Sequence, residues 1–152
     1  MINLVNGRVF DNVLTLGSDD FFIGSLSYGE CKDPYRTKVD QAIANGSLSL
    51  LDDSRVSATR FADLLNQYSL GDGETECLLF TTDLGYSMAS DDRKARTIAQ
   101  SQAGESRVTG SLGLLRKAVR AGKLSQQNAM DAYTKMLESG GFLPGIDVNF
   151  FT

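Results

Sequence analysis

The stretch of residues 71–99 constrains the fold of this chain more than any other, because it places four structural signals in succession. An acidic turn is followed by an apolar run of helix length, a short strand-like run and a second acidic turn. This succession predicts that Glu74 lies in the first turn of one helix and that Asp91 and Asp92 lie where a strand ends. Ligands of open α/β sheets bind at the carboxyl ends of strands, so we expect a functional site there.

The whole chain repeats this alternation of short apolar runs with helix-length amphipathic segments, which is typical of parallel β-α-β units. The tail, residues 146–151, is apolar and is expected to form either an added strand or an interface patch. Residues 2–16 are predicted to form one or two helical turns followed by a helix. The predicted strands are 21–24, 47–51, 86–89 and 107–109. The remaining predicted helices are 25–33, 34–44, 56–68, 74–84, 92–102, 111–124 and 125–139.

Length and composition predict a single domain over residues 1–152. A chain of 152 residues with 41% hydrophobic content can bury roughly two thirds of its unfolded surface. No apolar run approaches the roughly 20 residues of a membrane-spanning helix, and we expect a cytoplasmic protein with no membrane partner. Cys31 and Cys77 are too few for a disulfide framework and are predicted to be reduced thiols.

The absence of histidine removes the Ser-His-Asp and Cys-His arrangements and the usual transition-metal sites. Acid-base or metal chemistry in this chain must therefore depend on carboxylates, lysine, tyrosine or water. The net charge of -4 is unevenly distributed. Residues 1–90 carry 6 basic and 13 acidic side chains, whereas residues 91–123 carry 8 basic and 3 acidic ones, which allows a local basic face on an acidic body.

The carboxylates near the predicted strand ends are candidate metal ligands: Glu30, Glu74 or Glu76, and Asp91 with Asp92. Clustered carboxylates raise one another's pKa, and a bound Mg²⁺ or Mn²⁺ relieves that repulsion. Such an ion can activate a water molecule and orient it toward a phosphodiester. A carboxylate site without histidine therefore suits nuclease chemistry.

Each of these residues also has a purely structural interpretation. Glu74, Asp91 and Asp92 occupy positions where acidic side chains ordinarily cap helices. Glu30 is compatible with a solvated helix face. The basic group of Arg93, Lys94 and Arg96 is most often a helix surface, and it does not by itself indicate nucleic-acid binding.

Three motifs in succession carry a family resemblance. Residues 73–77 read GETEC, residues 91–96 read DDRKAR and residues 110–115 read GSLGLL. This order resembles a PIN-like branch in which an acidic G-E-x-E-A helix precedes D-D-R-x-A-R and G-T-L-G-x-L-L, and the resemblance covers about residues 2–142. It implies a three-layer α/β/α fold with a short, mostly parallel sheet. It also implies a Mg²⁺- or Mn²⁺-dependent ribonuclease related to the VapC-type toxins of toxin–antitoxin pairs.

The resemblance assigns roles to individual residues. Glu30, Glu74 and Asp92 match metal-site positions, and Asp91 lies close by to assist. Arg93, Lys94 and Arg96 are then expected to attract RNA phosphates. The implied partners are RNA, a cognate antitoxin protein and further copies of the chain in a homo-oligomer, and the implied cleavage leaves a 5′-phosphate and a 3′-hydroxyl.

The sequence departs from the family at its beginning. PIN domains normally open with a strand that ends in an aspartate, whereas residues 1–4 here resemble the segment after that strand. Asp11 lies too far along to replace the aspartate. Three explanations remain open: an upstream start, a degenerate non-catalytic relative, or a strand supplied by another chain, for which residues 148–151 are one candidate donor. The alternative function is a catalytically inactive protein-binding or oligomerisation module.

Overall fold

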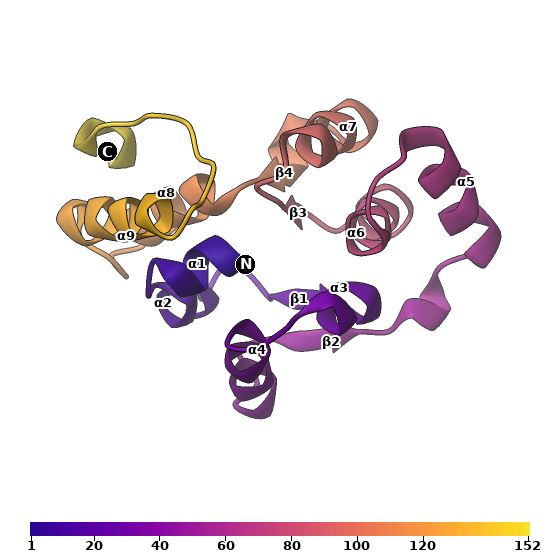
Figure 1. The fold of residues 1–152 in the computed structure, drawn as a ribbon, viewed down its shortest axis with the longest axis horizontal. Helices are drawn as coiled ribbons and strands as arrows, with labels where there is room; N and C mark the ends of the chain where they lie inside the picture. Colours follow the sequence, from indigo (N-terminus) through magenta and orange to yellow (C-terminus); the bar gives the residue numbers. More distant parts are fainter. The chain divides into compact units, whose positions relative to one another are not determined.

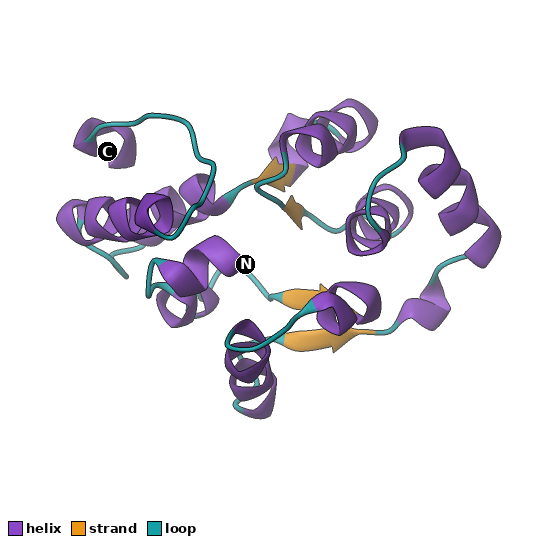
Figure 2. Ribbon diagram, viewed as in Figure 1, coloured by secondary structure: helices purple, strands orange, loops and turns teal.

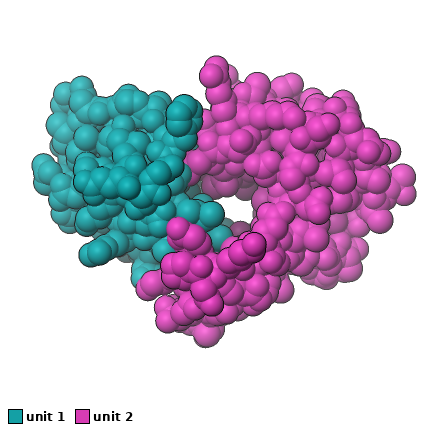
Figure 3. Space-filling view, viewed as in Figure 1, with its two compact units in different colours: residues 1–21, 110–152 teal, residues 22–109 magenta.

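The amphipathic segments fold as helices and the short apolar runs fold as strands, as the alternation predicts (Figures 1 and 2). The computed structural model describes residues 1–152, and the chain divides into two compact units (Figure 3). Unit 1 consists of Met1–Phe21 and Gly110–Thr152, and unit 2 consists of Phe22–Thr109. No helix combines the length and the apolar character that crossing a membrane requires. The single-domain prediction stays a prediction.

Unit 1 is entirely helical. Its core forms where α1 packs against α9, and where α8 packs against α2 and α9. Gly7 follows α1 at a close approach, since a Cβ there would lie 2.7 Å from Met136 Cε. The elements of this unit are α1 (Ile2–Asn6), α2 (Phe10–Leu14), α8 (Ser111–Arg120), α9 (Gln126–Glu138) and the 3₁₀ helix η3 (Val148–Phe151).

The tail of unit 1 does not form a strand, so that alternative for residues 146–151 is wrong. Asp147 begins η3 by accepting a hydrogen bond from the Asn149 N–H at 2.9 Å. Phe151 is fully buried, and η3 packs against α8 and α9. Arg116 lies 5.2 Å above the Phe150 ring. Burial of an aromatic side chain between two helices outweighs the apolar, strand-like composition of the segment. The same burial argues against these residues as a strand donor.

Unit 2 contains all the strands, in two separate pairs. β1 is parallel to β2, with Phe22 opposite Ser49, and β3 is parallel to β4, with Met88 opposite Val108. The strands are parallel as predicted, but the sheet is divided into two. In chain order the elements are β1 (Phe22–Gly24), α3 (Ser25–Glu30), α4 (Tyr35–Ala44), β2 (Ser49–Leu51), η1 (Asp53–Arg55), α5 (Ala58–Tyr68), α6 (Asp72–Asp83), β3 (Met88–Ala89), α7 (Arg93–Ala103), η2 (Glu105–Arg107) and β4 (Val108–Thr109).

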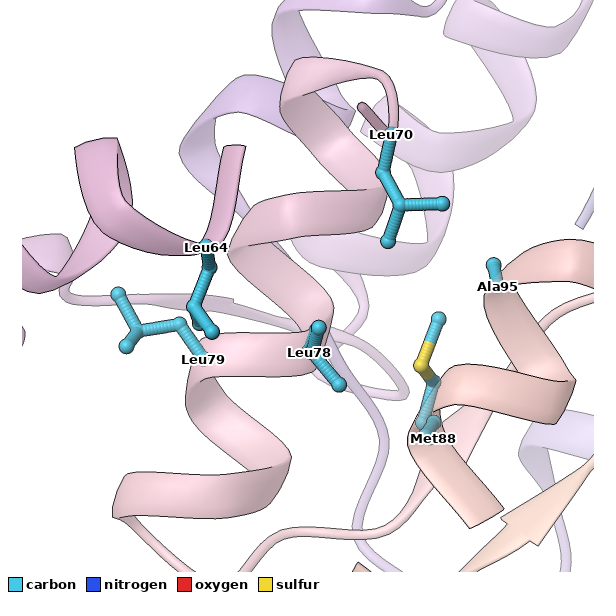
Figure 4. Close-up of a cluster of buried hydrophobic side chains, with 7 residues drawn as sticks. Leu64, Leu70, Leu78, Leu79, Met88 and Ala95 are labelled. Carbon is cyan, nitrogen blue, oxygen red and sulfur yellow. The ribbon is translucent and has the colours of Figure 1, made fainter. Parts of the chain in front are cut away.

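Helix α6 is the central element of unit 2, because α3, α5, α7, β1 and β3 all pack against it. Leu79 lies beside Leu64 of α5, and Leu78 lies on the side toward Met88 (Figure 4). Both leucines of α6 are fully buried. Each such side chain contributes about 1.5–3 kcal/mol through removal from water. The apolar character of α6 on both sides follows from having neighbours on both sides.

Two helices end earlier than their sequence patterns suggest. Helix α3 ends at Glu30 rather than at residue 33, because Asp33 precedes Pro34 and a residue before proline is disfavoured in helical conformation. Helix α8 ends at Arg120 rather than at residue 124. Gly122 has φ +68°, a left-handed conformation that terminates helices and suits glycine.

Candidate acidic site

The predicted acidic residues lie at one end of α6, because β1 and β3 both run in the opposite direction to this helix. Directly after β1, the Leu26 and Ser27 N–H groups bind the Glu76 side chain in the first half of α6. The residues before β3 lie near the other end of α6, where the Tyr86 N–H donates to the Phe80 carbonyl. After β3, Lys94 Nζ donates to the Ser69 carbonyl just ahead of α6, at 3.0 Å. Both strands therefore end near the N-terminus of α6.

Glu30 is the last residue of α3 and is exposed, but its carboxylate is bound to the backbone of α6. Its Oε1 accepts a hydrogen bond from the Gly73 N–H at 3.1 Å. A Cβ at residue 73 would lie 2.7 Å from Glu30 Oε2 and 2.9 Å from Ser27 Oγ. A larger side chain at this position would require Glu30 and Ser27 to shift. Glu30 is thus brought beside the residue that precedes Glu74.

Glu74 and Asp92 also bind backbone N–H groups at helix N-termini. Glu74 is half-buried, and its Oε2 accepts from the Gly71 N–H at 3.2 Å. Asp92 is exposed and begins α7, where its Oδ1 accepts from the Ala95 N–H at 2.7 Å. The structural interpretation of Glu74 and Asp92 as helix caps is therefore confirmed. Asp91, next to Asp92, is half-buried.

The arrangement of these side chains does not form a metal-binding cluster. A hard divalent ion needs several oxygen ligands within one coordination shell. No group of three or more Asp, Glu, Cys or His side chains is close enough to hold a metal ion together. The residues as arranged do not fit a resident Mg²⁺ or Mn²⁺, and the assignment of Glu30, Glu74 and Asp92 as metal ligands stays a prediction.

Glu76 has a role that sequence reasoning missed, because it was considered only as a substitute for Glu74. It is 2% exposed, and its two carboxylate oxygens accept from the Leu26 N–H at 3.0 Å and the Ser27 N–H at 3.1 Å. Ser25 Oγ lies 3.2 Å from Glu76 Oε1 and donates to Asp53 at 2.6 Å. A Cβ at Gly24 would clash with the Glu76 carboxylate. Glu76 therefore caps α3 from the neighbouring helix.

The predicted RNA-binding cations have structural contacts of their own. Lys94 binds the carbonyl of Ser69, the residue that ends α5 in a left-handed conformation with φ 50°. Arg96 Nη1 donates to the Ser90 carbonyl at 3.0 Å, immediately after β3. Arg93 is exposed on α7. These contacts connect α7 to α5 and β3, while RNA binding by the three residues stays a prediction.

Both cysteines are free thiols near Ser27. Cys31 Sγ donates to the Ser27 carbonyl at 3.3 Å, and Cys77 Sγ lies 3.6 Å from Ser27 Oγ. Burial raises the pKa of the Cys77 thiol. Burial also raises the pKa of Cys31, although the nearby Arg36 guanidinium acts in the opposite direction. Both thiols are therefore protonated at neutral pH, which does not suit a cysteine nucleophile.

Comparison with known proteins identifies the fold. A family model described as a PIN domain matches residues 12–145, which is most of the chain. Neither the curated proteins nor the solved structures contain a match. The matched range includes the α6 helix, the β3 to α7 junction and the short parallel strands described above. The chain therefore belongs to the PIN domain family, whose fold is of the nuclease type.

Proposed function

We propose that this chain acts as a polypeptide-binding module of the PIN domain family, and that it does not cleave RNA by itself. One observation carries the proposal. Glu30, Glu74 and Asp92 each accept a backbone N–H at a helix end, and no three acidic side chains gather. In this form the carboxylates stabilise the unit in which they lie.

The energetics of these contacts support a structural role. A side-chain oxygen that accepts a backbone N–H at a helix N-terminus contributes about 0.5–2 kcal/mol. Drawing the three side chains toward a common ion would weaken three such bonds and would bring like charges together. A fourth oxygen ligand, which the family's first strand supplies, would have to offset that cost.

Open strand edges in unit 2 support the binding half of the proposal. β1 is paired only with β2, and β3 only with β4, so each of these strands has one edge without a strand partner. Unpaired edges are templates for strand addition, in which main-chain hydrogen bonds supply affinity. The same edges suit a partner protein, such as an antitoxin, or a second copy of the chain.

An RNA cleavage assay tests the proposal. The matched variant carries Glu30→Gln, Glu74→Gln and Asp92→Asn, which keep an oxygen acceptor for each N–H and remove the charge. We expect neither protein to cut a labelled single-stranded RNA in Mg²⁺ or Mn²⁺. We also expect the two proteins to have the same affinity for Mn²⁺, measured by electron paramagnetic resonance. Cleavage by the wild type that the triple variant lacks would overturn the proposal.

Hydrogen exchange tests the binding half independently. Amides of residues 22–24 and 88–89 that have no strand partner should exchange with solvent far faster than the buried α6 amides of Leu78 and Leu79. Protection of the strand edges equal to that of α6 would mean that these edges are already covered, and it would contradict a binding role for them.

A Mg²⁺- or Mn²⁺-dependent ribonuclease of the toxin type is the second candidate. It is favoured by the position of Glu30, whose carboxylate accepts the N–H of Gly73, the residue directly before Glu74 in α6. In this candidate Glu30, Glu74 and Asp92 would have to leave their backbone N–H partners to hold the ion, with Asp91 beside them. For this candidate the single change Asp92→Asn should abolish cleavage while circular dichroism remains unchanged.

A further inference from the structure

We propose that unit 2 binds an acidic segment of a partner polypeptide at the C-terminal end of α6, the end opposite the acidic residues described above. The residues that bind it are Arg55, Tyr86 and Arg107, and we call them the arginine–tyrosine surface. This inference rests on the proposed polypeptide-binding function, and it names the chemistry of the partner and the side chains that contact it.

Tyr86 is held in place by the end of α6. The helix ends at Asp83, and Gly85 follows with φ +77°, a left-handed conformation that suits glycine. The chain then turns back, and the Tyr86 N–H donates to the Phe80 carbonyl at 3.3 Å. The Tyr86 ring also meets the buried Phe80 ring edge to face, with the two centroids 6.4 Å apart. The backbone and the ring of Tyr86 are therefore both fixed against α6, and its hydroxyl has a defined position.

Two arginines from other parts of the chain lie beside this turn. Arg55 is the last residue of η1, and its Nη1 donates to Tyr86 Oη at 3.3 Å. Arg107 is the last residue of η2, and its Nη1 lies 3.3 Å from the position that a Cβ would occupy at Gly85. Both arginines are exposed. Segments that precede and follow the turn in sequence thus bring two guanidinium groups to residues 85 and 86.

The donors of this surface have no acidic partner within the chain. Neither Arg55 nor Arg107 belongs to an ion pair. The ion pairs of the chain are Arg36–Asp40, Arg60–Asp83 and Lys117–Asp19. A tyrosine hydroxyl both accepts and donates, and Tyr86 Oη accepts from Arg55 while its own hydrogen has no acceptor in the chain. An ionised carboxylate only accepts, so it complements these three side chains in both hydrogen bonding and charge.

The surrounding charges favour separate carboxylates over a continuous polyanion. Asp52 and Asp53 lie just ahead of Arg55, and Glu105 lies two residues before Arg107. Unit 2 as a whole contains 13 acidic and 9 basic side chains. An RNA strand carries a charge on every nucleotide, and these carboxylates repel it. A polypeptide can place one carboxylate at each arginine with neutral residues between them, which avoids that repulsion.

Tyr86 indicates what lies between the two carboxylates of the partner. Its side chain is half-buried, and its ring offers apolar surface next to the polar hydroxyl. Tyrosine and arginine are enriched among the residues that dominate binding energy at protein interfaces. An apolar side chain of the partner can pack on this ring while its carboxylates pair with Arg55 and Arg107. The partner segment we infer therefore has an aromatic residue between two acidic ones.

Peptide binding to the full chain tests the proposal. The probe is a fluorescein-labelled, C-terminally amidated peptide of sequence Glu-Gly-Phe-Gly-Glu, and its binding is followed by fluorescence anisotropy. One control peptide replaces both glutamates with glutamine, and a second replaces the phenylalanine with serine. We expect saturable binding of the probe, at least tenfold weaker binding of the glutamine peptide and at least threefold weaker binding of the serine peptide. The affinity of the probe should fall as salt is added, because salt screens exposed ion pairs.

Protein variants locate the bound peptide. The double change Arg55→Gln with Arg107→Gln should weaken probe binding at least tenfold. Tyr86→Phe keeps the ring, removes the hydroxyl and should weaken probe binding at least threefold. The matched control is Lys38→Gln with Lys123→Gln, which removes the same charge from two exposed lysines elsewhere and should change the affinity less than twofold. Circular dichroism establishes that each variant keeps the fold.

Three outcomes with the peptides would overturn the proposal. They are no saturable binding of the probe, equal binding of the glutamine peptide, and unchanged binding by the double variant of Arg55 and Arg107. A fourth outcome concerns a single-stranded RNA of twelve uridines. If that RNA binds the wild type more tightly than the probe does and loses affinity in the same double variant, the surface binds nucleic acid instead of an acidic polypeptide.

This proposal and the proposed function fail separately. A chain that neither cleaves RNA nor binds the probe overturns the role of the arginine–tyrosine surface but leaves the absence of catalysis intact. A chain that cleaves RNA through Asp92 overturns the proposed function whatever the peptide does.

Discussion

The tail of unit 1 packs back onto its own helices, whereas unit 2 leaves strand edges without a strand partner. In unit 1 the tail returns to cover α8 and α9, and Phe151 is fully buried. In unit 2 two pairs of strands remain separate. The polar side chains that are buried differ in the same way, since unit 1 has Ser111 and unit 2 has Thr75, Glu76 and Thr81.

The two units also differ in net charge. Unit 1 carries 6 acidic and 6 basic side chains, while unit 2 carries an acidic excess. A unit with unpaired edges and carboxylates bound to helix N-termini depends on specific polar contacts. The open strand edges and the buried polar contacts of unit 2 indicate that a binding or catalytic site of this chain should be sought there.

The largest expected effect tests the closure of unit 1. Phe151→Ala removes a fully buried aromatic side chain between α8 and α9 and should lower the free energy of unfolding by about 3–5 kcal/mol. Phe142 is 98% exposed, and Phe142→Ala is the matched control, expected to change it by less than about 0.5 kcal/mol. Urea unfolding measures both variants. Equal effects would show that the tail contributes nothing to the core.

The second prediction tests the polar contacts of unit 2. Glu76→Ala leaves the Leu26 and Ser27 N–H groups without their acceptors and should cost about 2–4 kcal/mol. Glu76→Gln keeps one oxygen acceptor and should cost less. The measurement is urea unfolding, with hydrogen exchange of the α3 amides as a local readout. If α3 amides exchange at the wild-type rate in Glu76→Ala, the capping role assigned to Glu76 is wrong.

Helices and strands could be predicted from the sequence because they depend on residues that are close together in the chain. Amphipathic spacing and caps such as Asp92 determine where helices begin, and all four predicted strands are present. The motifs over residues 73–77, 91–96 and 110–115 correctly indicated the PIN domain family.

The remaining features depend on partners distant in sequence. Glu76 is satisfied by N–H groups about fifty residues away, and no spacing rule identifies them. By sequence, Lys94 and Arg96 fit a solvated cationic face, whereas in the structure they donate to the carbonyls of Ser69 and Ser90. The apolar segment that contains Phe151 suits either a strand or an interface patch, and only packing against α8 and α9 determines that it forms a 3₁₀ helix. Grouping of the acidic residues into a metal site depends on side-chain directions, which local patterns do not determine.

The smallest predicted effect compares two glycine-to-alanine changes, one at a position with open space and one at a close contact between helices. Gly29→Ala adds a Cβ inside α3 where no atom lies within 4 Å, and it should stabilise the chain by about 0.4–1 kcal/mol, because alanine loses less backbone entropy in a helix. Gly73→Ala adds the same Cβ to α6, but against Glu30 Oε2 at 2.7 Å and Ser27 Cα at 3.1 Å. It should destabilise the chain by about 1–3 kcal/mol, since backbone cannot move aside as a flexible side chain can. Thermal unfolding of the two variants gives opposite shifts if α3 and α6 meet as closely as described. Stabilisation by both changes would mean that Glu30 is free to move, and the acidic end of α6 would then be open to ligands in a way that its present hydrogen bonds exclude.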